Sequence, residues 1–78
     1  MRDGIEGSIL SVDTDWGFVV INVGEQDGVR ENGELMVSRG GKLVGKVQIS
    51  SVENDRSVAH VMPGWLQADI KVGDEVLY

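Results

Sequence analysis

Residues 29–37, VRENGELMV, decide how the chain is divided into strands. Read alone, Asn32-Gly33 predicts the tip of a β-hairpin, because a type I′ turn needs two successive residues with positive φ. Residues 70–78, IKVGDEVLY, show the same order of apolar and acidic residues 41 positions later, and Asn32 then falls on Gly73. Both residue types tolerate the left-handed conformation, in which a β-branched residue is strained. The sequence therefore predicts that Asn32 forms a left-handed corner from which a strand starts.

The match at residues 29–37 is part of a longer internal similarity. Residues 19–21, VVI, align with residues 58–60, VAH, in strands that follow a turn in each case. We therefore predict an internal repeat, with halves at about residues 4–38 and 42–78.

The composition is typical of an all-β protein. Glycine occurs 11 times and proline once in the 78 residues, and the apolar residues are mostly valine and isoleucine, which favour strands. Apart from one possible helical turn at residues 65–70, no stretch shows apolar residues at helical spacing. Strands are expected at residues 5–12, 18–23, 34–38, 43–52, 57–62 and 74–78. Because closing a sheet removes its exposed edges, we predict one domain over residues 1–78, a small six-stranded barrel of SH3-like or cradle-loop-like type, built from two β-β-β halves.

Two local features refine this prediction. The apolar residues of the first strand change face between Ile9 and Leu10, which predicts a bulge or a bend there. Gly40-Gly41 predicts a two-residue hairpin turn, because glycine accepts positive φ at both central positions.

The charge of the chain disfavours nucleic acid as a partner. Thirteen acidic residues against seven basic ones give a net charge of −6, and the basic residues are scattered among acidic ones. Such a surface repels a phosphate backbone. The absence of cysteine excludes disulfides and thiolate metal sites. The longest apolar run, Phe18–Ile21, is too short to span a bilayer, and no apolar segment follows Met1, so neither a membrane span nor a signal peptide is expected. A domain cut from an exported protein would look the same.

No candidate catalytic or metal-binding residue stands in a pattern that specifies chemistry. His60, the single histidine, is expected on a half-solvated strand face, where a structural role is commoner than a pH-sensitive one. Asp13-Thr14-Asp15 has the carboxylate spacing that begins a calcium loop, but aspartate in a turn usually bonds its own backbone. Glu34 and Glu75 occupy equivalent positions in the two halves, which favours a solvating role over paired acid–base catalysis. We therefore expect no enzyme activity, no cofactor and no metal.

Trp16 and Trp65 are the candidate partner-binding residues. Each stands next to a glycine at the end of a strand. Tryptophan is enriched at the centres of protein interfaces, but it is also large enough to close the end of a small barrel. The sequence leaves both roles open.

Several short motifs carry a resemblance to a known family. They are V-x-I-N-x-G at residues 19–24, G-V at 28–29, a strand of the type G-[DE]-x-[LF]-x-V at 33–37, G-K-V at 45–47 and S-x-A-x-V at 57–61. Over residues 4–78 the chain resembles the C-terminal β-domain of flagellar assembly protein T and related small envelope barrels, such as that of rod-shape-determining protein C. The resemblance implies a non-enzymatic structural or adaptor module, in the periplasm or elsewhere in the bacterial cell envelope.

These observations lead to one expected function and one alternative. The expected function is a structural or protein-interaction module, an assembly domain that binds a protein partner or a second copy of itself. The alternative is a small-ligand or glycan-binding barrel that uses an exposed tryptophan as a stacking surface.

Overall fold

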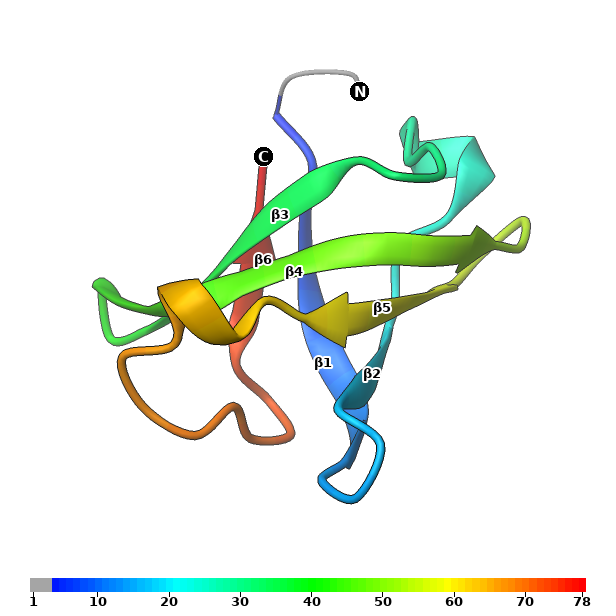
Figure 1. Cartoon of the computed structure of the whole chain (residues 1–78). Coiled ribbons are helices and arrows are strands. Elements are labelled where there is room, and N and C mark those ends of the chain that lie inside the picture. Colours follow the sequence, from blue (N-terminus) through cyan, green and yellow to red (C-terminus); the bar gives the residue numbers. More distant parts are fainter. Residues whose placement is uncertain (1–3) are drawn as a thin grey trace.

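The chain folds into a closed antiparallel β-barrel (Figure 1). The computed structural model describes residues 4–78. The strands are β1 (Glu6–Asp13), β2 (Phe18–Ile21), β3 (Glu34–Arg39), β4 (Lys42–Val52), β5 (Ser57–Val61) and β6 (Glu75–Leu77), and the 3₁₀ turns are η1 (Glu25–Asp27) and η2 (Pro63–Trp65). Their order around the barrel is β1-β2-β5-β4-β3-β6, and β6 pairs again with β1. The predicted all-β fold with six barrel strands is confirmed.

The predicted strands differ from the observed ones by one or two residues at their ends, but the predicted helical turn at residues 65–70 is wrong. The turn begins earlier, at Pro63, whose ring holds φ near the helical value and whose missing N–H is not needed in a first turn. It ends at Trp65, because the backbone then runs beside β4. There the N–H of Gln67 donates to the carbonyl oxygen of Val44 at 2.7 Å.

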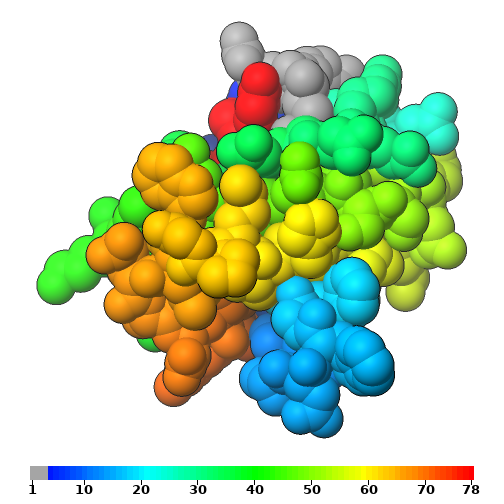
Figure 2. Space-filling view, in the orientation of Figure 1, coloured from blue at the N-terminus to red at the C-terminus, as the bar shows by residue number. Residues whose placement is uncertain are grey.

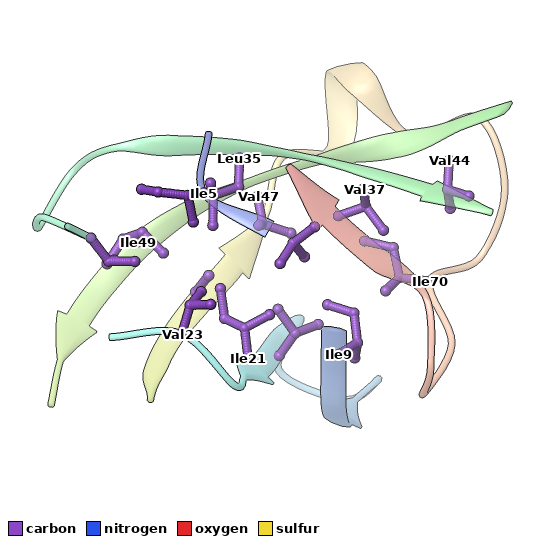
Figure 3. Close-up of a cluster of buried hydrophobic side chains, with 14 residues drawn as sticks. Ile5, Ile9, Ile21, Val23, Leu35, Val37, Val44, Val47, Ile49 and Ile70 are labelled. Atoms are coloured by element: carbon purple, nitrogen blue, oxygen red, sulfur yellow. The ribbon is translucent and has the colours of Figure 1, made fainter. Parts of the chain in front are cut away.

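The interior of the barrel is filled by aliphatic side chains (Figure 3). Within residues 4–78 the buried apolar cluster consists of Ile5, Ile9, Val19, Ile21, Val23, Val29, Leu35, Val37, Val44, Val47, Ile49, Ala59, Ile70 and Val76. The strands supply ten of them from inward-facing positions, since successive side chains of a strand point to opposite faces, and the connecting segments supply Ile5, Val23, Val29 and Ile70. Fully burying one such valine, leucine or isoleucine stabilises the fold by about 1.5–3 kcal/mol. The buried hydroxyl of Ser57 is satisfied, because its Oγ donates to the carbonyl oxygen of Val23 at 2.8 Å.

The left-handed corner predicted at Asn32 is confirmed. Asn32 has a φ of 65° and its counterpart Gly73 a φ of 92°. The N–H of Asn32 donates to the carbonyl oxygen of Ile49 at 2.9 Å, and the N–H of Gly73 donates to that of Ile9 at 2.9 Å. β3 and β6 therefore start from the same kind of corner, each anchored on the long strand of the other half.

The bulge predicted in β1 is confirmed, and β4 has a matching one. The strand register shifts between Ile9 and Ser11 in β1, and between Ile49 and Ser51 in β4. The extra residue of β1, Leu10, points outward and is half exposed. A bulge increases local bend and twist, which a sheet needs in order to close over so few strands.

The barrel consists of two β-β-β halves, β1-β2-β3 and β4-β5-β6. Exchanging each strand of one half with its counterpart in the other leaves the order of the barrel unchanged. The halves are joined by the turn at Gly40 and Gly41, which have φ values of 60° and 80°. This is the two-residue hairpin turn that the sequence predicts.

The alignment of residues 19–21 with residues 58–60 is wrong by one position. Ser11 of β1 pairs with Val20, and its counterpart Ser51 of β4 pairs with Val58, so the exchange of halves places residues 19–21 on residues 57–59. Burial agrees with the corrected register, because Val19 and Ile21 are buried, as are Ser57 and Ala59. A shift of one residue along a strand moves every side chain to the other face, and apolar residues on both faces of β2 and β5 hide that shift in the sequence.

Candidate functional site

A groove lies between the turn that joins β1 to β2 and residues 63–71, which follow β5. Figure 2 shows these two segments, in blue and orange, side by side on one face of the molecule. The groove has a volume of about 780 Å³. Its apolar lining consists of Val12, Trp16, Val61, Pro63, Leu66 and Ile70. We call it the Trp16 groove, and an open groove with this lining can bury the apolar surface of a ligand.

Trp16 lies at the tip of the β1–β2 turn, and 77% of its surface is exposed. The turn is built by Asp13, whose Oδ1 accepts the N–H groups of Asp15 and Trp16 at 3.1 and 3.2 Å. The carbonyl oxygen of Asp13 accepts the N–H of Gly17 at 2.9 Å, and that of Gly17 accepts the N–H of Val61 at 2.8 Å. Backbone groups and one carboxylate hold this turn, so the indole ring of Trp16 is available for an external contact.

Residues 66–71 form the opposite wall without regular secondary structure. Leu66 packs on Gly45 of β4, where an added Cβ would meet Leu66 Cδ1 at 3.2 Å. Two backbone N–H groups of the segment donate to the carbonyl oxygen of Val44 at 2.7 and 3.3 Å. Ile70 is buried in the core. These anchors give the wall a defined position beside the barrel.

An ion pair between the exposed Arg39 and the buried carboxylate of Asp74 holds the end of this wall. Arg39 Nε and Nη2 donate to the two carboxylate oxygens of Asp74 at 2.7 and 2.8 Å, and Nη2 also donates to the carbonyl oxygen of Asp69 at 2.8 Å. The hydrogen bonds from Arg39 hold the pKa of Asp74 below its ordinary value, against the opposing effect of burial, and the N–H of Lys71 adds to the lowering. Asp74 raises the pKa of Arg39 in turn. The pair joins β3 to the loop that lines the groove.

The polar lining of the groove consists of Asp13, Thr14, His60, Asp69 and Lys71. His60 is half-buried, as the sequence predicts, and its Nδ1 lies 3.0 Å from Ser50 Oγ at the bulge of β4. Two carboxylates and one ammonium group therefore face the groove. Asp15, the neighbour of Trp16, adds a third carboxylate at the tip of the turn.

Trp65 does not line the Trp16 groove. It lies in η2 beside β4, where Lys46 Nζ is 3.9 Å from the centroid of its ring. Trp65 is 46% exposed, and Trp16 is more exposed still. With most of its surface exposed, Trp16 does not close the end of the barrel.

The remaining candidate residues have structural positions. Asp13 bonds its own turn, as expected of an aspartate there, and residues 4–78 contain no group of histidine, aspartate and glutamate side chains placed to hold a metal ion. Glu34 and Glu75 are exposed on β3 and β6. Within residues 4–78 the buried carboxylate is that of Asp74, and it is paired with Arg39.

Sequence analysis missed the ion pair between Arg39 and Asp74. The signal was present in the alignment of the two halves, where Asp74 falls on Gly33 and so departs from the shared pattern. The sequence also gives no sign that Leu66 and Ile70 line a groove, because it predicts a helical turn for the segment that contains them. Their partner surface is the β1–β2 turn, which lies about fifty residues away in the sequence.

The comparisons with known proteins do not assign a family. No protein-family model matches the chain, and a search of curated proteins finds no significant match. Among residues 4–78 there is no helix with the length and apolar character that crossing a membrane requires. The Trp16 groove is therefore the structural feature that bears on function.

Proposed function

We propose that the chain is a non-enzymatic protein-interaction module that docks a partner protein in the Trp16 groove. The observation that carries this proposal is the exposure of Trp16, 77%, beside an apolar groove. The turn is held by Asp13 and not by the indole, so the ring has no role in the fold that would explain its position. Tryptophan contributes more binding free energy per residue than most side chains at protein interfaces.

The ionisable groups support a binding role over a catalytic one. A general acid or base needs a pKa close to the working pH, which enzymes commonly reach by burying a carboxylate without a partner. The buried carboxylate in residues 4–78, Asp74, has its pKa lowered by Arg39, so it is moved away from neutrality. His60 lies in the groove with Ser50, and no carboxylate is hydrogen-bonded to its ring within the described residues.

The setting that we propose is assembly of a bacterial cell-envelope or flagellar-associated protein. Support comes from the resemblance of residues 4–78 to the C-terminal β-domain of flagellar assembly protein T. We also propose that the two halves descend from one duplicated β-β-β unit. The matching hydrogen bonds at Asn32 and Gly73 support that origin.

A peptide-library selection tests the docking site. Peptides selected on the immobilised chain are expected to bind the Trp16→Ala variant roughly 10-fold more weakly than the wild type, as for an interface hot spot. Trp65→Ala is the matched control, since Trp65 is also exposed but lies outside the groove. Trp16→Ala is expected to change the free energy of unfolding by less than about 0.5 kcal/mol, as for other exposed positions.

Three other outcomes would contradict the docking site or change the kind of partner. Peptides that bind Trp16→Ala as tightly as the wild type would contradict the groove as the docking site. Light scattering that finds a dimer in the wild type and a monomer in Trp16→Ala would make a second copy the partner. A glycan array with Trp16-dependent binding, where the peptide library yields none, would replace the protein partner by a glycan.

A further inference from the structure

We infer that the Trp16 groove takes a cationic peptide segment, whose lysine or arginine side chain lies over the indole ring of Trp16. This inference rests on the proposed function and adds the chemistry of the partner. It follows from a comparison of the two tryptophans, from the charges of the groove walls and from the apolar lining between them.

The two exposed tryptophans differ in whether the chain supplies its own cation. Lys46 Nζ lies 3.9 Å from the ring centroid of Trp65, well within the distance at which an ammonium group is attracted to an indole face. Within residues 4–78 no cation lies over Trp16. Trp65 therefore already has a cation over its indole ring, whereas the ring of Trp16 is open to a cation supplied by a partner.

The charges around Trp16 favour a cation. Asp13 on one wall and Asp69 on the other both line the groove, and Asp15 stands next to Trp16 in the turn. Lys71 is the opposing charge in the lining, and Arg39 lies beside the wall at Asp69, whose carbonyl oxygen accepts from its Nη2. The whole chain has a net charge of −6, so the long-range field attracts basic segments and repels acidic ones.

The lining between the walls favours a peptide over a small free cation. Pro63 and Leu66 present exposed apolar surface in the same groove as Trp16, and a bare metal or ammonium ion would leave that surface uncovered. A peptide with apolar residues next to its lysine or arginine covers the apolar lining and pairs with the carboxylates at the same time.

A matched pair of synthetic peptides tests the charge requirement. The probes are acetyl-Ala-Leu-Xaa-Leu-Ala-amide with arginine or citrulline at Xaa, which have nearly the same shape and differ in charge. Binding is followed by NMR on the ¹⁵N-labelled chain, with the two indole N–H signals assigned from Trp16→Ala and Trp65→Ala. The arginine peptide is expected to shift the Trp16 indole signal and the amides of residues 13–17 and 66–71. The citrulline peptide is expected to bind roughly 10-fold more weakly, from loss of the cation–π contact and the ion pairs.

A charge-matched pair of variants tests the role of the carboxylates. Asp13→Asn with Asp69→Asn removes two charges from the groove, and asparagine keeps the oxygen that caps the turn. Glu31→Gln with Glu53→Gln removes two charges from exposed positions outside it. The first variant is expected to bind the arginine peptide about 3- to 10-fold more weakly, and the second to bind it like the wild type.

Three results would overturn the inference while leaving the proposed function intact. One is equal affinity for the arginine and citrulline peptides at the Trp16 indole. Another is equal weakening in the two double variants, which would mean attraction to net charge alone. The third is no shift of the Trp16 signal by the arginine peptide, while library-selected peptides still bind in a Trp16-dependent way. If neither the arginine peptide nor any library peptide depends on Trp16, both proposals fail together.

Discussion

At the scale of single residues, Asn32 tests the left-handed corner. Its φ of 65° is accessible to asparagine and glycine, but a β-branched side chain is strained there. We expect Asn32→Gly to change the free energy of unfolding by less than about 0.5 kcal/mol, and Asn32→Val to lower it by about 1–2 kcal/mol. Urea denaturation measures both. An Asn32→Val variant as stable as the wild type would contradict the corner.

Gly24, which follows β2, is predicted to be intolerant of any side chain. A Cβ at this position would overlap the carbonyl oxygen of Glu53 and lie 2.6 Å from the backbone nitrogen of Arg56. Backbone atoms cannot move aside as the end of a flexible side chain can. Gly24→Ala should therefore lower the free energy of unfolding by about 1–3 kcal/mol, measured by thermal or chemical denaturation.

Gly64 is the matched control for this prediction. A Cβ added at Gly64 meets nothing within 4 Å, and its φ is not positive. Gly64→Ala should leave stability unchanged or raise it slightly, because alanine restricts the unfolded chain. Equal stability of Gly24→Ala and Gly64→Ala would show that β2 and the β4–β5 turn do not approach as closely as described.

At the scale of elements, the ion pair between Arg39 and Asp74 predicts how stability depends on pH. The pKa of Asp74 is lowered in the folded state from an ordinary value of 3.8. Its contribution to stability is therefore complete above about pH 4 and is lost as the pH falls through the lower, folded-state pKa. We expect the free energy of unfolding to fall with pH below about 4, measured by urea titrations at a series of pH values.

Asp74→Asn removes the titrating group and serves as the comparison. It should be less stable than the wild type at pH 7, and the difference in stability should shrink as the pH falls further below about 4. Arg39→Met should flatten the acid dependence in the same way, because it removes the main cause of the lowered pKa. Parallel curves for the wild type and Asp74→Asn would mean that other carboxylates control acid unfolding.

The elements also show what the sequence could predict. The strands follow from alternation and turn residues, which depend on neighbours in the chain. The corner at Asn32 follows from its match with Gly73, because few residue types accept the left-handed conformation. The groove could not be predicted in the same way. It depends on the distance between the β1–β2 turn and residues 66–71. It also depends on the hydrogen bonds to Val44 that hold residues 67 and 68 beside β4. Contacts between distant segments leave little local signal.

At the scale of the whole molecule, the two halves depend on each other. Only β1–β2 and β4–β5 pair within a half, so four of the six strand pairings around the barrel join one half to the other. A lone two-stranded hairpin is marginally stable at best. We expect peptides 1–40 and 41–78, separated at the Gly40–Gly41 turn, to lack β-sheet circular dichroism alone and to regain it when mixed in equal amounts. An isolated half with a cooperative unfolding transition would contradict this dependence.

The pairing of β1 with β6 also bears on how the protein is made. Glu6, Gly7 and Ser8 find their partners in the three residues of β6, near the far end of the sequence. During translation β1 leaves the ribosome first, and one of its edges stays open until β6 has been synthesised. Until then the aliphatic face meant for the barrel interior is accessible, and it is a surface that a chaperone can recognise. The ring of strands therefore cannot close before β6, the last of the six strands in sequence, is available to pair with β1.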